Sequence, residues 1–128
     1  MPATDVYTAL AEAVRAAGNI DEIGVCSGRG RTAVVFSGVN VLNKYFDGTK
    51  FVEIQFNITG ADEITEQQAL VHKLCGICED LKGAVLDVAG FMRAKVLVNS
   101  LPVPVMHDQQ TWIYSARIAV RGFMKGMI

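Results

Sequence analysis

The chain has 128 residues, of which 51% are hydrophobic, and its 12 basic and 13 acidic residues leave a net charge of −1 at pH 7. The apolar fraction argues against disorder, and the length suits one domain, residues 1–128, whose core needs no disulfide or metal. A near-neutral charge argues against a protein that grips a duplex with a basic face. No apolar run approaches the roughly 20 residues that span a bilayer, and the N-terminus lacks a signal peptide, so we expect cytoplasmic synthesis and no membrane contact.

The first half of the chain predicts a helix followed by a hairpin. Apolar residues recur at three- and four-residue steps over residues 4–17, and Gly18-Asn19 can end a helix there. Residues 33–42 are rich in β-branched and aromatic side chains, which predicts a strand with Gly38 as a candidate bulge. An Asp-Gly turn then precedes the clearest strand, residues 51–59, in which four apolar side chains alternate with polar ones: Val52, Ile54, Phe56 and Ile58.

The second half predicts another helix over residues 63–82 and further strands over 95–99 and 111–120. Residues 84–93 fit a loop, a short strand or a helical turn. Pro102 and Pro104 restrict their segment to a sheet edge or an extended arm, because neither can donate to a ladder. Strands and helices do not alternate strictly, so we expect an α+β fold with an antiparallel, or mostly antiparallel, sheet and two helices packed on one face.

Cys75 and Cys78 have the spacing of a redox couple, but such couples sit at a helix N-terminus, where the dipole stabilises a thiolate. Here both fall about three turns into the predicted helix, where they can serve as small buried hydrophobes. His72 shares their helix face, yet a structural zinc site needs four ligands, and Cys26 and His107 are isolated in sequence. We therefore expect no metal and no cofactor, with a thiol-redox or metal-binding module at Cys75 and Cys78 as the alternative.

Two further segments carry polar groups that could do chemistry. The Gly-Arg loop that contains Arg29 and Arg31 is followed by a strand, whereas a phosphate-binding loop precedes a helix. His107-Asp108 is an adjacent acid–base pair with no Ser or Cys nucleophile placed near it by motif. Asp62, Glu63 and Glu66 fit the negative charge that favours a helix start. No catalytic constellation emerges, so the chain is not expected to be an enzyme.

The order of elements resembles the minor-capsid and tail-terminator families of long-tailed bacteriophages and prophages. The resemblance spans most of the chain and rests on an opening helix, a Tyr-x-Asp-Gly turn before the alternating strand, a central amphipathic helix, a proline-interrupted segment and a closing aromatic strand. These are Val6 to Ala17, Tyr45-Phe46-Asp47-Gly48 before Phe51 to Thr59, Ile64 to Leu81, Pro102 and Pro104, and Trp112-Ile113-Tyr114-Ser115-Ala116-Arg117.

This resemblance implies a structural protein that forms a ring, with six copies as the expectation. The ring would cap the tail tube in the tail or neck of the virion, after assembly in the host cytoplasm, and would contact tail-tube and head-connector proteins. The resemblance implies no catalytic residue or cofactor. It leaves open a terminator or another neck protein, and a small-ligand or nucleic-acid-binding module stays a further alternative.

Composition then suggests where copies would meet. A sheet edge carries unpaired backbone groups that a neighbour can satisfy, so the edges and residues 99–110 are natural contacts. The candidate interface residues are Pro102, Pro104, Trp112, Phe123 and Met124. If the ring encloses DNA, Arg29 and Arg31 are candidates to face the lumen and touch phosphates without reading sequence.

Overall fold

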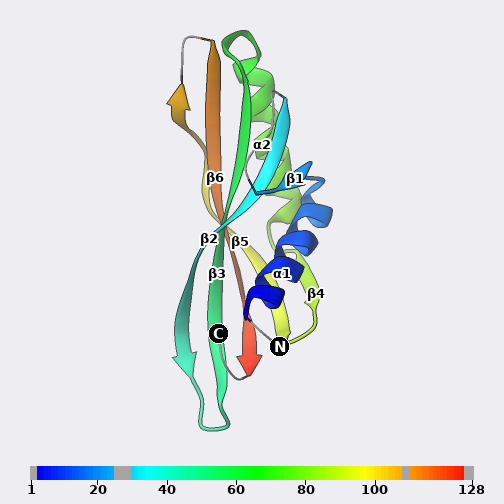
Figure 1. Ribbon diagram of the computed structural model, residues 1–128, viewed down its shortest axis with the longest axis vertical. Coiled ribbons are helices and arrows are strands. Elements are labelled where there is room, and N and C mark those ends of the chain that lie inside the picture. Colours follow the sequence, from blue (N-terminus) through cyan, green and yellow to red (C-terminus); the bar gives the residue numbers. More distant parts are fainter. Residues whose placement is uncertain (1–2, 25–29, 108–109, 126–128) are drawn as a thin grey trace.

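Six strands curl around two α-helices in the computed structural model, which describes residues 3–24, 30–107 and 110–125 (Figure 1). One short 3-10 turn, η1 (Ile64–Glu66), leads into the second helix. The other elements, in chain order, are α1 (Ala3–Gly18), β1 (Glu22–Ile23), β2 (Arg31–Lys44), β3 (Thr49–Glu63), α2 (Gln67–Leu81), β4 (Val85–Val88), β5 (Phe91–His107) and β6 (Thr111–Lys125).

The predicted fold class, α+β with an antiparallel or mostly antiparallel sheet and two helices packed on one face, is wrong: the chain is mostly β, and its two helices lie within the curl of the sheet and not on a flat face. Strands make up most of the described chain, and they form one curled sheet, a half-barrel, in the order β1-β2-β3-β6-β5-β4. The sheet is mixed because β1 runs parallel to β2. Two features escaped the sequence patterns. The two-residue β1 is too short to show periodicity, and β5 is longer than the strand predicted over residues 95–99. Pro102 and Pro104 lie on an edge stretch of β5, which confirms the first of the two options predicted for them.

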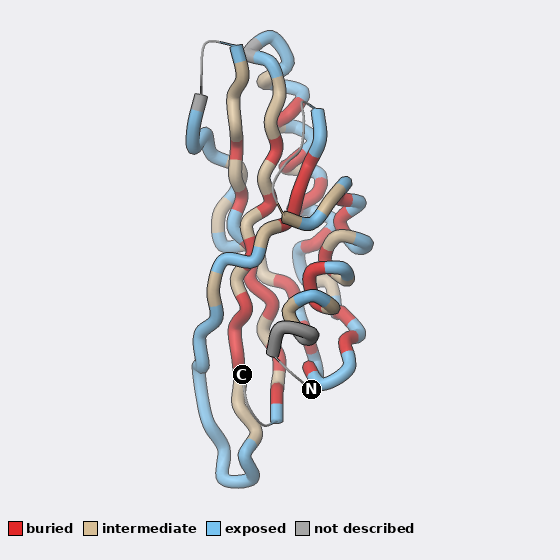
Figure 2. Tube along the Cα trace, in the orientation of Figure 1, coloured by how far each residue is buried: buried red, intermediate tan, exposed pale blue. Residues whose placement is uncertain are grey.

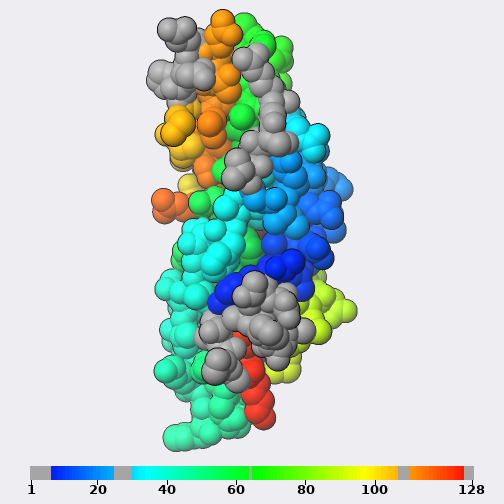
Figure 3. All heavy atoms as spheres, viewed as in Figure 1, coloured from blue at the N-terminus to red at the C-terminus, as the bar shows by residue number. Residues whose placement is uncertain are grey.

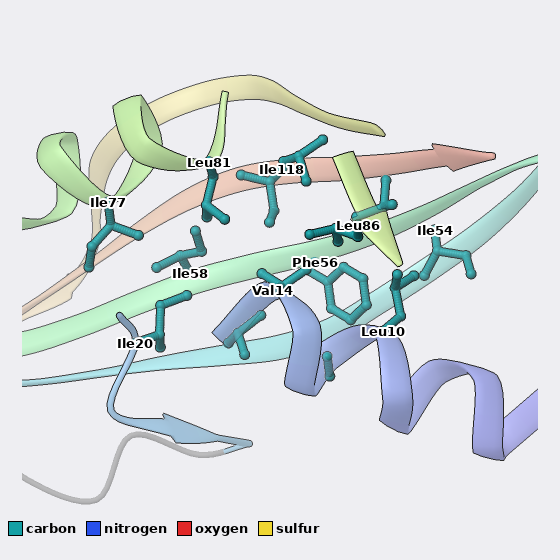
Figure 4. Close-up of a cluster of buried hydrophobic side chains, with 14 of the residues drawn as sticks. Leu10, Val14, Ile20, Ile54, Phe56, Ile58, Ile77, Leu81, Leu86 and Ile118 are labelled. Carbon is teal, nitrogen blue, oxygen red and sulfur yellow. The ribbon is translucent and has the colours of Figure 1, made fainter. Parts of the chain in front are cut away.

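The strand predicted over residues 51–59 is confirmed as the middle of β3, where Val52, Ile54, Phe56 and Ile58 are fully buried. Each pairs with a residue of β6 on the same side of the sheet, for example Phe56 with Ile118. We call this helix-facing side the inner side and the opposite one the outer side. Helix α1 contributes Leu10 and Val14 to the same core (Figures 2 and 4).

The helix predictions hold, with shifted ends. Helix α1 ends at Gly18, and Asn19 takes the left-handed conformation that was expected of a helix stop. Helix α2 begins at Gln67 and not at residue 63, because η1 precedes it. Gly38 lies at a register shift between β2 and β3, as the predicted bulge requires. The ambiguous residues 84–93 form β4, a turn and the start of β5. Among the described helices, none is long and apolar enough to cross a membrane.

Candidate assembly surfaces

Two stretches of strand have a neighbour on one side only. Strand β1 pairs with β2 at Ala33 and Val34, so residues 35–44 of β2 pair with β3 alone within the described part of the chain. Strand β4 pairs with β5 only up to Lys95, so among the described strands β6 is the one partner of residues 97–107 of β5. These two free edges lie at opposite ends of the elongated molecule, β2 at the lower end and β5 at the upper end (Figure 1).

Both free edges are apolar and uncharged. No Asp, Glu, Lys or Arg occurs in residues 32–43 or in residues 96–106. Natural proteins usually protect an exposed edge with charged side chains, because unpaired N–H and C=O groups otherwise capture another strand. Large apolar side chains are exposed on both edges, namely Val39, Val41 and Leu42 on β2 and Leu101, Val103, Val105 and Met106 on β5. Such edges are suited to contact with another chain.

The two edges differ in their backbone donors. Pro102 is half-buried and Pro104 is exposed, and both lie in the free stretch of β5. A proline has no N–H, so this edge keeps its carbonyl acceptors and loses two donors. The free stretch of β2 contains no proline. Two β5 edges facing each other would each be short of these two donors, so the proline-free β2 edge is the better complement to β5.

An aromatic turn closes the β2–β3 hairpin at the lower end of the molecule (Figure 3). Phe46 is fully exposed, and the ring of Tyr45 lies 6.2 Å from that of Phe123, which in turn lies 5.0 Å from Phe51. The backbone N–H of Thr49 donates to the Asp47 carboxylate at 3.0 Å, and this bond lowers the pKa of Asp47. An apolar hollow of about 420 Å³ next to the turn adds to this surface.

The structure divides the predicted interface residues between the two ends of the sheet. Pro104 and Trp112 lie at the upper end, where β5 and β6 pair, and Trp112 is half-buried. Phe123 is half-buried at the lower end. Met124 is 3% exposed and belongs to the core, so it is already used within the chain and offers no surface to a neighbour. The interface role of the other residues stays a prediction.

Arg31 opens β2 and lies 3.8 Å from the Glu22 carboxylate, while Arg29 lies outside the described residues. Next to Arg31, the Asp21 carboxylate accepts hydrogen bonds from the Thr32 backbone N–H at 2.8 Å and from its hydroxyl at 3.1 Å. These bonds, and Lys73 of α2 at 3.4 Å, lower the pKa of Asp21 despite its partial burial. This network ties the start of β2 to α2. It gives no sign that Arg31 faces DNA.

Cys75 and Cys78 lie on α2, half-buried and buried respectively. Burial raises the pKa of the Cys78 thiol, and the nearby Cys75 and Glu79 add to the effect. A redox couple needs the opposite, a stabilised thiolate. Within the described residues no three metal-ligating side chains gather, and His72 is exposed. Cys26, Asp108 and the side chain of His107 lie outside the described residues.

We expect Cys78 to react slowly with iodoacetamide at neutral pH in the folded protein. Its thiol is 1% exposed and its pKa is raised, so little reactive thiolate is available. Mass spectrometry of alkylated peptides measures this rate, and unfolding in urea should bring it to that of a free thiol. Rapid modification of Cys78 in the folded protein would favour the redox alternative.

The geometry defines a class of protein: a small strand-rich domain whose curled sheet presents two uncharged free edges. The solved structure described as the virion of a native gene transfer agent (GTA) particle contains a chain of similar fold. The two align with a TM-score of 0.67 and 15% sequence identity, over 94% of this chain and 98% of that chain. At this identity the likeness shows the fold. No family model matches the sequence, and no curated protein matches it.

Proposed function

We propose that this protein is a structural, non-enzymatic component of a phage-type virion. The observation that carries the proposal is the fold, which nearly the whole chain shares with a chain of a gene transfer agent virion. The two uncharged free edges support it, because exposed apolar surface at near-zero net charge favours association with neighbouring proteins.

Within that class we propose a tail terminator or another head–tail joining protein, located in the tail or neck of the particle after assembly in the host cytoplasm. Copies of the chain form a ring, and we expect six copies in it. The ring contacts the tail tube on one side and the head connector on the other. A ring needs two different surfaces on each copy, so that every contact is head-to-tail. The proline-free edge of β2 and the proline-bearing edge of β5 are two such surfaces.

Size-exclusion chromatography with light scattering tests this assembly. The wild-type protein should elute as an oligomer, whereas Val41→Lys should elute as a monomer, because the new charge lies on the free edge of β2. Val105→Lys should act in the same way from the β5 edge. Ala16→Lys adds the same charge at an exposed position of α1 and should leave the oligomer intact.

Thermal unfolding of each variant shows whether it still folds, since substitutions of exposed residues usually change stability little. Negative-stain electron microscopy of the oligomer should show rings. A wild-type protein that stays monomeric at its highest soluble concentration contradicts the proposal. So does an oligomer that both edge variants leave unchanged.

A further inference from the structure

A polar hollow of about 350 Å³ lies on the outer side of the sheet. Register places Asn57 of β3, Arg117 of β6 and Ser100 of β5 in one row across three strands. The next row on this side contains Gln55 of β3, which pairs with the buried Ala119 of β6. Six polar residues line the hollow, and none of them is acidic: Ser37, Gln55, Asn57, Asn99, Ser100 and Arg117.

Arg117 is the charged residue of this hollow, and no counter-charge for it lies among the described residues. Arg121 lies four residues further along β6 on the same side of the sheet, and its Nε donates to the Glu53 carboxylate at 2.7 Å. Arg117 is exposed, and among the residues that the structure describes no ion pair or hydrogen bond engages its guanidinium. One of two arginines on one strand is thus neutralised within the chain, and the other is open to an external anion.

The donors around Arg117 suit an oxyanion with acceptors in several directions. A guanidinium offers a planar fork of N–H groups that matches phosphate or carboxylate oxygens. The amides of Asn57 and Asn99 and the hydroxyl of Ser37 lie around it on three other strands. Two further lining groups are already engaged, because Nε2 of Gln55 donates to the Glu53 carboxylate at 2.8 Å and the Ser100 hydroxyl donates to the Leu101 carbonyl at 3.1 Å. A carboxylate uses one flat edge, whereas a tetrahedral phosphate presents oxygens to several strands at once.

We propose that this hollow binds a phosphate oxyanion, held by the Arg117 fork, the Asn57 and Asn99 amides and the Ser37 hydroxyl. Two sources offer that chemistry, free phosphate and the backbone of DNA. The DNA source rests on the proposed function, since a head–tail joining ring encloses the path of the genome. Binding of free phosphate rests on the hollow alone.

Two titrations of the wild-type protein separate the sources. Inorganic phosphate is followed by NMR shifts of the Asn57 and Asn99 amides, and a short fluorescent duplex is followed by anisotropy at several salt concentrations. Arg117→Gln should weaken phosphate binding about tenfold, the usual effect of losing a charge-assisted hydrogen bond. It should also reduce the slope of log K against log salt for the duplex by about one, because one phosphate contact is lost.

Matched variants sharpen the test. Arg117→Lys keeps the charge but loses the fork, so its affinity should fall between those of wild type and Arg117→Gln. Arg15→Gln removes an arginine from α1, away from the hollow, and should bind like wild type. Phosphate binding with no duplex binding assigns the hollow to free phosphate. Failure of wild type to bind either ligand overturns the proposal, as does wild-type affinity in Arg117→Gln or equal binding of acetate.

The hollow lies within one chain, so this test does not depend on assembly. The monomeric Val41→Lys variant should bind inorganic phosphate as the wild type does. A wild-type protein that stays monomeric and still binds phosphate would count against the ring alone. An intact ring in which Arg117→Gln binds phosphate unchanged would count against the hollow alone.

Discussion

Gly122→Ala should destabilise the protein by roughly 2–3 kcal/mol, the cost of overpacking a well-filled core. A Cβ at position 122 would lie 2.5 Å from Cε1 of Phe91 and 2.8 Å from the carbonyl oxygen of Met92. Phe91 is 1% exposed, and the Met92 carbonyl belongs to the backbone of the paired strand, so neither can move aside cheaply. Chemical denaturation monitored by circular dichroism measures the loss.

Two other glycines give matched controls for this change. A Cβ at Gly60 would meet only the ends of the Leu70 and Leu74 side chains, at 2.8 and 3.2 Å, and these can turn away, so Gly60→Ala should cost less than Gly122→Ala. Gly76 lies within α2 with nothing within 4 Å, so Gly76→Ala should stabilise the protein by roughly 1 kcal/mol. Equal stability of all three variants would contradict the packing around Gly122.

Arg121→Leu should lower the free energy of unfolding by about 2 kcal/mol at neutral pH, because it leaves a nearly buried carboxylate without its cation. Glu53 is 6% exposed, and its oxygens accept from Nε2 of Gln55 at 2.8 Å and from Nε of Arg121 at 2.7 Å. The estimate is below that for a fully buried pair, because the Arg121 side chain is itself partly exposed. Glu53→Gln removes the charge together with the need for its partner and should cost less than Arg121→Leu.

Acid should weaken the same interaction. The hydrogen bond from Gln55 and the contact with Arg121 lower the pKa of Glu53 below its ordinary 4.5, against the opposing effect of burial. A carboxyl with a lowered folded-state pKa adds stability above its ordinary pKa and loses it as the pH falls through the lowered value. Urea titrations from neutral pH into the acid range should therefore show wild type approaching Glu53→Gln. A constant difference between the two at all pH values would contradict this assignment.

The sequence predicted the parts of the fold that depend on local periodicity. The alternation from Phe51 to Thr59 defined the inner and outer sides of β3, and Tyr45-Phe46-Asp47-Gly48 forms the hairpin turn. The length of β5 could not be predicted in this way. A proline is harmful inside a sheet and harmless on a free edge, and the edge exists only once the order of the strands is known. The parallel pairing of β1 likewise depends on tertiary contact.

The candidate surfaces, too, could be predicted only in part from the sequence. Met124 was predicted to lie at an interface. It is separated from the buried Ala116, Ile118 and Val120 by an even number of residues, so the alternation along β6, extended to its end, places Met124 on the inner side. The absence of charge in residues 32–43 and 96–106 was readable in the sequence, but its importance appears only when these residues become free edges. The hollow at Arg117 had no local signal, because its lining comes from four strands brought together by register.

The place of β6 in the sheet also bears on how the chain is made. Strand β6 is the last in sequence, yet it lies between β3 and β5 and pairs with β3 along its whole length, from Thr49 with Lys125 to Glu63 with Thr111. Until residue 125 has left the ribosome, β3 and β5 lack their shared partner strand, and the apolar side chains that β6 would cover stay exposed to solvent. The sheet can therefore close only once β6 has emerged, and until then the nascent chain exposes apolar surface of the kind that chaperones bind.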